Sequence, residues 1–191
     1  MDLSFLIIIA VIIVGVFYTI VVYNGLVNLK HNVAKAWSNI DVLLKQRHDE
    51  LPKLVEVCKQ YKDFEQETLE RVIKARSAVM NARQHEDMGA LGAAESQLRL
   101  GLGNLFALAE SYPDLKANSN FQQLQSRISQ LENSIADRRE VYNESVNLNN
   151  VRIEQFPDVI IARLFAFKDF SLLEFSDAET QDVDIKSLFN S

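Results

Sequence analysis

The sequence has a single cysteine and lacks the residue pairs that bind metal ions in helical proteins. Cys58 alone cannot form a disulfide within the chain, and its place on an apolar helix face indicates a buried, unreactive thiol. A di-iron bundle needs a glutamate three residues before a histidine, and His31, His48 and His85 all lack one. No two histidines lie four residues apart, as a helical zinc site requires. The sequence therefore predicts no metal and no cofactor.

The sequence also lacks the motifs of common catalytic and nucleotide-binding sites. It has no Gly-x-Ser-x-Gly motif and no glycine-rich phosphate loop, since its later glycines lie in a helical pattern. Gly101 and Gly103 are expected to let two helices approach closely. Six charged residues could share one site: Asp41, Glu65, Glu110, Arg47, Arg76 and Arg138. We expect them to form salt bridges within a helical bundle instead. The sequence predicts a protein that is not an enzyme.

Positive charge is scarce as well. The chain has 20 Lys and Arg against 26 Asp and Glu, with a formal net charge of −6, and it has no basic stripe. Binding to nucleic acid depends on clustered Lys and Arg, which neutralise phosphates. The composition therefore excludes nucleic acid as an expected partner and argues against broad docking onto anionic lipid.

No charged residue occurs from Leu3 to Leu29, and most of this run is apolar. About 20 apolar residues in a helix cross the roughly 30 Å hydrocarbon layer of a bilayer. A cleaved signal peptide would need a basic start, a shorter apolar run and small residues at a cleavage site. We therefore predict a retained transmembrane helix over residues 1–25. Lys30 and Lys35 follow the run, so the amino terminus is expected outside and the rest of the chain in the cytoplasm.

Beyond the anchor, apolar residues recur every three or four positions, which predicts helices, and no strand-like alternation of useful length appears. The first of these helices continues the transmembrane helix and is expected to be interrupted at residues 48–52, because Pro52 lacks a backbone N–H. A second is expected over residues 52–83, followed by a polar turn at 84–89. A third ends at Pro113, and a capping box of Ser119 and Gln122 opens a fourth. The predicted fold is all-α: a transmembrane helix that continues into an antiparallel bundle of about four long helices.

The fourth predicted helix becomes polar near its end. After Ile135 the positions that carried apolar residues hold Arg138, Tyr142 and Asn149, with further asparagines beside them. This pattern fits a solvated helix end. It also fits a polar surface kept for a partner, or a buried hydrogen-bond network.

Several segments, in order along residues 23–170, resemble the LemA family. The most specific is Ala109-Glu110-Ser111-Tyr112-Pro113-Asp114-Leu115-Lys116-Ala117-Asn118. The others are Tyr23-Asn24-Gly25-Leu26-Val27, Ala36-Trp37-Ser38-Asn39-Ile40-Asp41-Val42, Pro52-Lys53-Leu54-Val55, Leu69-Glu70-Arg71-Val72, Ala75-Arg76, Phe121-Gln122-Gln123-Leu124, Glu132-Asn133-Ser134-Ile135, Arg138-Arg139, Tyr142-Asn143 and Phe156-Pro157. Two features depart from the family pattern: Phe64 replaces a usual histidine, and the acidic tail from Glu174 lies outside the shared segments.

The resemblance implies a bacterial protein with one transmembrane helix, a cytoplasmic helical bundle and no known enzymatic activity. One branch of the family is associated with magnetosome membranes. The expected location is the bacterial cytoplasmic (inner) membrane. We expect an anchor at 1–25, a bundle at 26–156, an amphipathic Phe-rich segment at 157–175 and an acidic tail at 176–191.

Two functions remain open at this point. The favoured one is a non-enzymatic scaffold or adaptor that forms a homo-oligomer on the lipid bilayer, with another membrane protein as a possible partner. The alternative is a membrane-tethered sensor or regulatory subunit that binds a ligand through the polar end of the fourth helix, with a pocket around Tyr142 and Asn143. The candidate partner or oligomer contacts are Trp37, Leu44, Leu69, Leu108, Arg138, Tyr142 and Asn143.

The segment after the fourth helix is expected to lie beside the anchor. Its apolar side is large, and Arg163 and Lys168 suit the opposite face. We therefore predict that it contacts the lipid headgroup region or a neighbouring subunit's anchor, and packing on its own bundle is the alternative. The candidate membrane-interface residues are Ile160, Ile161, Leu164, Phe165 and Phe167.

Overall fold

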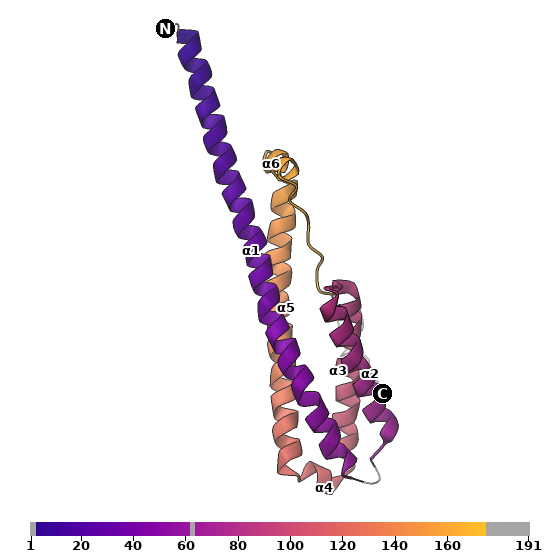
Figure 1. The fold of residues 1–191 in the computed structure, drawn as a ribbon. Helices are drawn as coiled ribbons and strands as arrows, with labels where there is room; N and C mark the ends of the chain where they lie inside the picture. Colours follow the sequence, from indigo (N-terminus) through magenta and orange to yellow (C-terminus); the bar gives the residue numbers. More distant parts are fainter. Residues whose placement is uncertain (1–2, 62–63, 175–191) are drawn as a thin grey trace, which may run out of the picture. The chain divides into compact units, whose positions relative to one another are not determined.

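The computed structural model describes residues 3–61 and 64–174, and all the regular structure within these ranges is helical (Figure 1). The helices are α1 (Leu3–Lys59), α2 (Gln66–Gln84), α3 (Met88–Ala109), α4 (Pro113–Lys116), α5 (Ser119–Glu154) and α6 (Asp158–Leu164). The all-α prediction is confirmed. The predicted acidic tail, residues 176–191, lies outside the described residues.

The contacts divide the chain into two compact units. Unit 1 comprises Met1–Ile40 and Asp137–Leu172, and unit 2 comprises Asp41–Ala136 with the described residues that follow Leu172. Helices α1 and α5 each contribute to both units. The divisions at residues 25, 156 and 175 stay predictions.

The predicted interruption at Pro52 is wrong. Pro52 lies inside α1, which continues to Lys59, so the second helix does not begin until Gln66. A proline has no N–H to bond the carbonyl four residues earlier, here that of His48. Arg76 of α2 satisfies this carbonyl instead, with Nε donating to it at 3.0 Å. The exposed Pro52 ring also avoids the core, so the helix tolerates it.

Unit 2 is a bundle of the second part of α1, helices α2 and α3, and the first part of α5. Gly101 of α3 faces Val72 of α2, where a Cβ would lie 3.4 Å from Val72 Cγ2, so the expected close approach is confirmed there. At Gly103 no heavy atom of another described segment comes within 4 Å, and the same expectation is wrong. The buried core of unit 2 includes Leu44, Leu51, Leu54, Cys58, Leu69, Val72, Leu91, Leu98, Leu105, Leu115, Ile128 and Ile135.

Asn118 caps α5, one residue before the predicted capping box. Its side-chain oxygen accepts the backbone N–H groups of Asn120 at 2.9 Å and Phe121 at 3.1 Å. The Gln122 side chain donates to the carbonyl of Lys116 instead of closing a box on Ser119. The predicted start of the helix is therefore confirmed, although a different side chain forms the cap.

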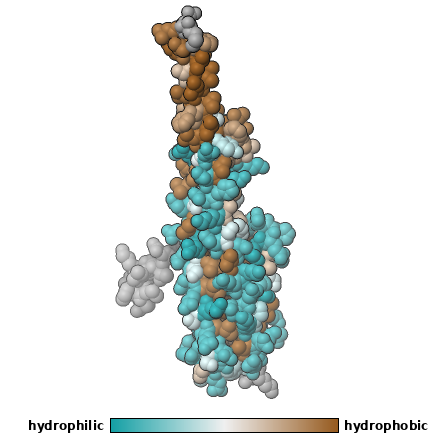
Figure 2. Space-filling view, turned by 60° about the vertical axis from the view of Figure 1, so that its left-hand side comes forward, coloured by the Kyte–Doolittle hydropathy of each residue, from teal (hydrophilic) through white to brown (hydrophobic). Residues whose placement is uncertain are grey.

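Unit 1 contains the first part of α1, the end of α5, helix α6 and an extended segment after it. The beginning of α1 is long and apolar enough to cross a membrane, and its large apolar side chains are exposed. Figure 2 shows these hydrophobic residues gathered over the amino-terminal part of the helix. The structure therefore contains one candidate membrane span among the described residues.

Candidate functional site

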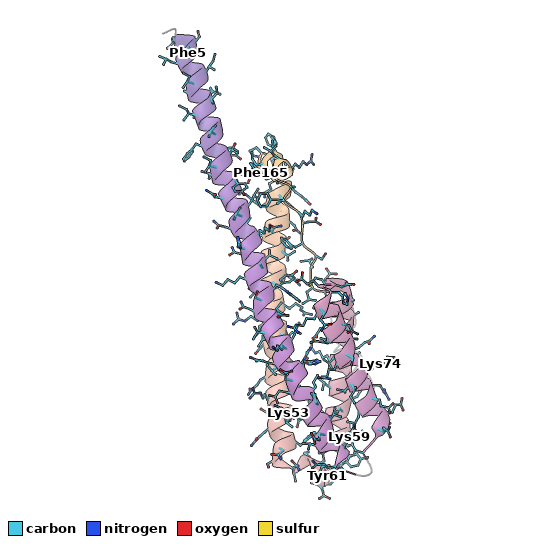
Figure 3. The ribbon with its side chains drawn as sticks, viewed as in Figure 1. Phe5, Lys53, Lys59, Tyr61, Lys74 and Phe165 are labelled. Carbon is cyan, nitrogen blue, oxygen red and sulfur yellow. The ribbon has the colours of Figure 1, made fainter. Side chains whose placement is uncertain are left out.

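Helix α6 packs against α1 where the uncharged run approaches its end. Val22 and Leu26 of α1 form a buried cluster with Ile161 and Ala162 of α6. Figure 3 shows Phe165, at the end of α6, beside α1. The ring of Tyr23 lies 4.8 Å from that of Phe165, measured between centroids. The segment after α5 therefore lies beside the predicted anchor.

A polar contact fixes the beginning of α6 to the same helix. The Tyr18 hydroxyl donates to Asp158 Oδ1 at 2.7 Å. Arg152, near the end of α5, forms an ion pair with the other carboxylate oxygen. The buried Asp158 carboxylate is thus neutralised by one cation and bound by one hydroxyl. Three helices of unit 1 meet at this group.

The structure separates the predicted membrane-interface residues into two sets. Ile161 is buried and Phe167 half-buried against α1, so these two belong to the internal packing. Ile160, Leu164 and Phe165 are exposed. Sequence reasoning missed Phe156, whose exposed ring precedes Pro157, although the same apolar run contains it. Contact with lipid stays a prediction for the exposed set.

The polar end of α5 binds an extended segment of the chain itself, which we call the strap (residues 168–171). Asn150 forms two hydrogen bonds with the backbone of Phe170: its Nδ2 donates at 2.8 Å and its Oδ1 accepts at 3.0 Å. Asn149 Nδ2 donates to the Lys168 carbonyl, and the Tyr142 hydroxyl donates to the Ser171 carbonyl at 3.0 Å. The asparagines are therefore part of a hydrogen-bond network, which was one of the open interpretations.

This network bears on the predicted ligand pocket. Tyr142 is buried, its hydroxyl binds the strap, and its ring lies 5.9 Å from that of Trp37. Asn143 is half-buried and Arg138 exposed. A ligand at Tyr142 would have to displace Ser171, so the arrangement favours a structural role for the polar end of α5.

Replacing Asn150 with alanine should release the strap locally. The variant loses both hydrogen bonds to Phe170, at about 0.5–1.5 kcal/mol each. Since 1.4 kcal/mol is about tenfold in an equilibrium, amide hydrogen exchange at Phe170 should accelerate roughly ten- to a hundredfold. Asn147→Ala, at an exposed position of the same helix, is the matched control. Equal rates of amide exchange at Phe170 in the two variants would show that Asn150 does not hold the strap.

Two of the predicted oligomer contacts are not on the surface. Leu44 and Leu69 are buried in unit 2, at 1% and 3% exposure, and their selection as contacts between copies was wrong. Both lie on helix faces that pack into the core of the bundle. Trp37 and Leu108 are half-buried and keep part of their surface.

A buried ionic group connects three helices within unit 2. The Arg47 guanidinium of α1 donates to Glu95 of α3 and to Glu132 of α5, and Arg47 is 1% exposed. Burial acts to lower the pKa of Arg47, but the two carboxylates outweigh it and hold the pKa above its usual value. The cation therefore stays charged and joins three helices.

Four of the other five charged residues that could have shared one site have separate partners instead. Asp41 binds Arg83, Glu110 binds Lys116, and Glu65 accepts from Thr68. Arg76 lies against His48, whose Nε2 is 2.7 Å from Arg76 Nη2. Burial and the Arg76 charge lower the pKa of His48, so its ring is neutral at pH 7 and Nε2 accepts the hydrogen bond. Asp41–Arg83 and Glu110–Lys116 are therefore salt bridges, as expected, and the other two contacts are hydrogen bonds.

The structure describes neither a reactive thiol nor a metal site within residues 3–61 and 64–174. Burial raises the pKa of the Cys58 thiol to about 12, so the nucleophilic thiolate is not formed at neutral pH. The described part of the chain has no group of three or more His, Cys, Asp or Glu side chains placed to hold a metal ion.

Comparison with known proteins places these features in a family. The LemA family model matches residues 36–186. Protein LemA of Metamycoplasma hominis is 29% identical over 188 residues, which cover 97% of this chain and 85% of that protein. The match to residue 186 corrects our expectation that the acidic tail from Glu174 lies outside the shared pattern.

Two magnetosome proteins are more distant relatives. Magnetosome protein MamQ of Magnetospirillum gryphiswaldense and magnetosome protein MamQ 2 of Paramagnetospirillum magneticum are each 22% identical over 169 residues. These alignments cover 76% of this chain and 62% of each relative, so the chain spans less than two thirds of their length. Because the family model matches most of the sequence, the chain belongs to the LemA family.

Proposed function

We propose that this protein is a non-enzymatic scaffold or adaptor, anchored in the bacterial cytoplasmic membrane with its amino terminus outside and its bundle in the cytoplasm. The observation that carries the proposal is the continuity of α1. A single helix, Leu3–Lys59, includes both the apolar span and a core helix of unit 2. An anchor joined to a bundle without a loop suits a protein that presents a folded surface at a membrane.

The packing of unit 2 supports this role. Arg47 connects α1 with α3 and α5, and Arg76 satisfies the one carbonyl of α1 that Pro52 leaves without its helical partner. These contacts hold the membrane-anchored helix in the bundle. The likeness to two magnetosome proteins supports an association with a membrane.

Self-assembly is part of the proposal, and α5 supplies the surface for it. Val141, Leu148 and Val151 are exposed, and their spacing of seven and three residues places them on one helix face. Leu148 and Val151 also line a pocket of about 370 Å³ with Gly25 and Leu29 of α1. Apolar residues at coiled-coil spacing beside an apolar pocket fit a second copy of the same helix. The remaining accessible candidates, Trp37, Leu108, Arg138 and Asn143, are proposed as secondary contacts.

The size of the detergent-extracted protein tests this proposal. Light scattering after size exclusion should show an oligomer, and Leu148→Glu should dissociate it by placing a charge in the contact. Asn147→Glu, exposed on the same helix but beside the apolar face, should leave the size unchanged. A wild-type monomer at high concentration would overturn self-assembly, and an oligomer that survives Leu148→Glu would exclude this surface. Mass spectrometry of the same extract identifies a second membrane protein if the chain is an adaptor.

A further inference from the structure

The outer side of α6 and its flanks is strongly apolar. Phe156 is 82% exposed, Ile160 57%, Leu164 71% and Phe165 49%. The inner side of the same segment is already occupied, because Ile161 and Ala162 are buried with Val22 and Leu26 of α1. Contiguous exposed apolar residues of this size on a soluble surface mark an interaction site.

The position of this face along α1 indicates what covers it. Contacts between α6 and α1 extend from Tyr18 to Leu26, and the first charged residue of α1 is Lys30. At 1.5 Å per residue, Leu26 lies only about 6 Å before that charge along the helix. Whatever surrounds the last apolar turns of α1 therefore also surrounds the outer face of α6.

The charged residues near α6 fit the boundary of a bilayer. Lys30 and Lys168 line one pocket of about 410 Å³, together with Asn149, Ala166, Phe167, Asp169 and Phe170. Arg163 is exposed on α6 itself. Cations just beyond an apolar face can meet lipid phosphates. Asp158, at the start of α6, pairs with Arg152 and accepts a hydrogen bond from Tyr18. Its charge is therefore compensated and does not prevent α6 from entering an apolar environment.

We propose that the face formed by Phe156, Ile160, Leu164 and Phe165 inserts into the headgroup and acyl boundary of the inner leaflet, beside the span of the same chain. Its partner is lipid. This inference deepens the proposed function and rests on its membrane span, but it is independent of self-assembly. The segment acts as a second membrane contact, which fixes α6 at the bilayer surface, while Ile161, Phe167 and part of the Phe165 ring contact α1.

Tryptophan fluorescence in vesicles tests the insertion. Trp37, the single tryptophan, is replaced by phenylalanine, and Leu164→Trp is introduced in the full-length protein in phosphatidylcholine vesicles. Brominated lipids should quench this tryptophan several-fold more strongly when the bromine is near the headgroup than when it is deep in the chain. Leu100→Trp, at an exposed apolar position of α3, is the control and should show little quenching.

A third variant separates failure of this inference from failure of the anchor. Ile12→Trp, within the apolar run, should be quenched best by deep bromine atoms. If the tryptophan at residue 12 is quenched and the tryptophan at residue 164 is quenched no more than the one at residue 100, the inference is overturned and the anchor stays intact. Loss of quenching at residues 12 and 164 together overturns both. Cross-linking between copies at residue 164 without lipid quenching identifies a second copy as the occupant, which also overturns the inference.

Discussion

Replacing Arg47 with methionine should lower the free energy of unfolding by about 3–5 kcal/mol, because it leaves the Glu95 and Glu132 carboxylates without their cation. Methionine fills much of the volume of the arginine stem, so the loss arises mainly from uncompensated charge. Glu95 is 3% exposed and cannot turn to water without opening the bundle. Urea unfolding of the protein in mild detergent, followed by circular dichroism, measures the change.

Two companion variants isolate the cause. Lys53→Met removes an exposed cation of the same helix, whose partner is Glu50 at 3.1 Å, and should cost at most about 1 kcal/mol. Adding Glu95→Gln and Glu132→Gln to Arg47→Met should recover much of the stability, since no buried charge then remains. If Arg47→Met and Lys53→Met are equally stable, the ionic group does not hold the bundle.

Gly92→Ala should destabilise unit 2 by about 1–3 kcal/mol, the usual cost of overpacking. A Cβ at residue 92 would lie 1.8 Å from the Glu174 carbonyl oxygen and 2.9 Å from its carbonyl carbon. Both are backbone atoms, so no side-chain rotation relieves the clash. If residues 173–174 move away, the burial of Leu173, now 1% exposed, is lost, and this costs about 1.5–3 kcal/mol.

Gly103→Ala is a matched control in the same helix, α3. Its Cβ would meet no heavy atom of another described segment within 4 Å, and alanine is the better helix former by about 0.5–1 kcal/mol. We therefore expect opposite signs: Gly103→Ala raises the unfolding midpoint in urea, and Gly92→Ala lowers it. Stabilisation by both substitutions would show that residues 173–174 do not press on α3.

Local sequence patterns predicted most of the helices correctly. The polar turn at residues 84–89 contains the observed gap between α2 and α3, and the start of α5 at Ser119 was predicted directly. Backbone hydrogen bonds in a helix join residues four apart, so apolar periodicity and polar turns within a short window contain this information. Pro52 was misread because its effect depends on Arg76, a residue from another helix.

The candidate site was less accessible to the same reasoning. The apolar residues of 156–170 were identified from the sequence, but their division into an inner set with Ile161 and an outer set with Leu164 required the position of α1. The asparagines of α5 were recognised as unusual, yet their partners are backbone groups of the strap, which sequence patterns do not reveal.

The sequence by itself determined the uncharged apolar helix, the helical class and the family, because each depends on composition or on patterns along the chain. The tertiary structure alone decided which charges pair with Arg47, why Gly92 cannot carry a side chain, and which face of α6 remains exposed. These properties depend on atoms that are far apart in the sequence and within a few ångströms in space. Steric exclusion and buried charge pairing act only over such distances, so they follow from the fold.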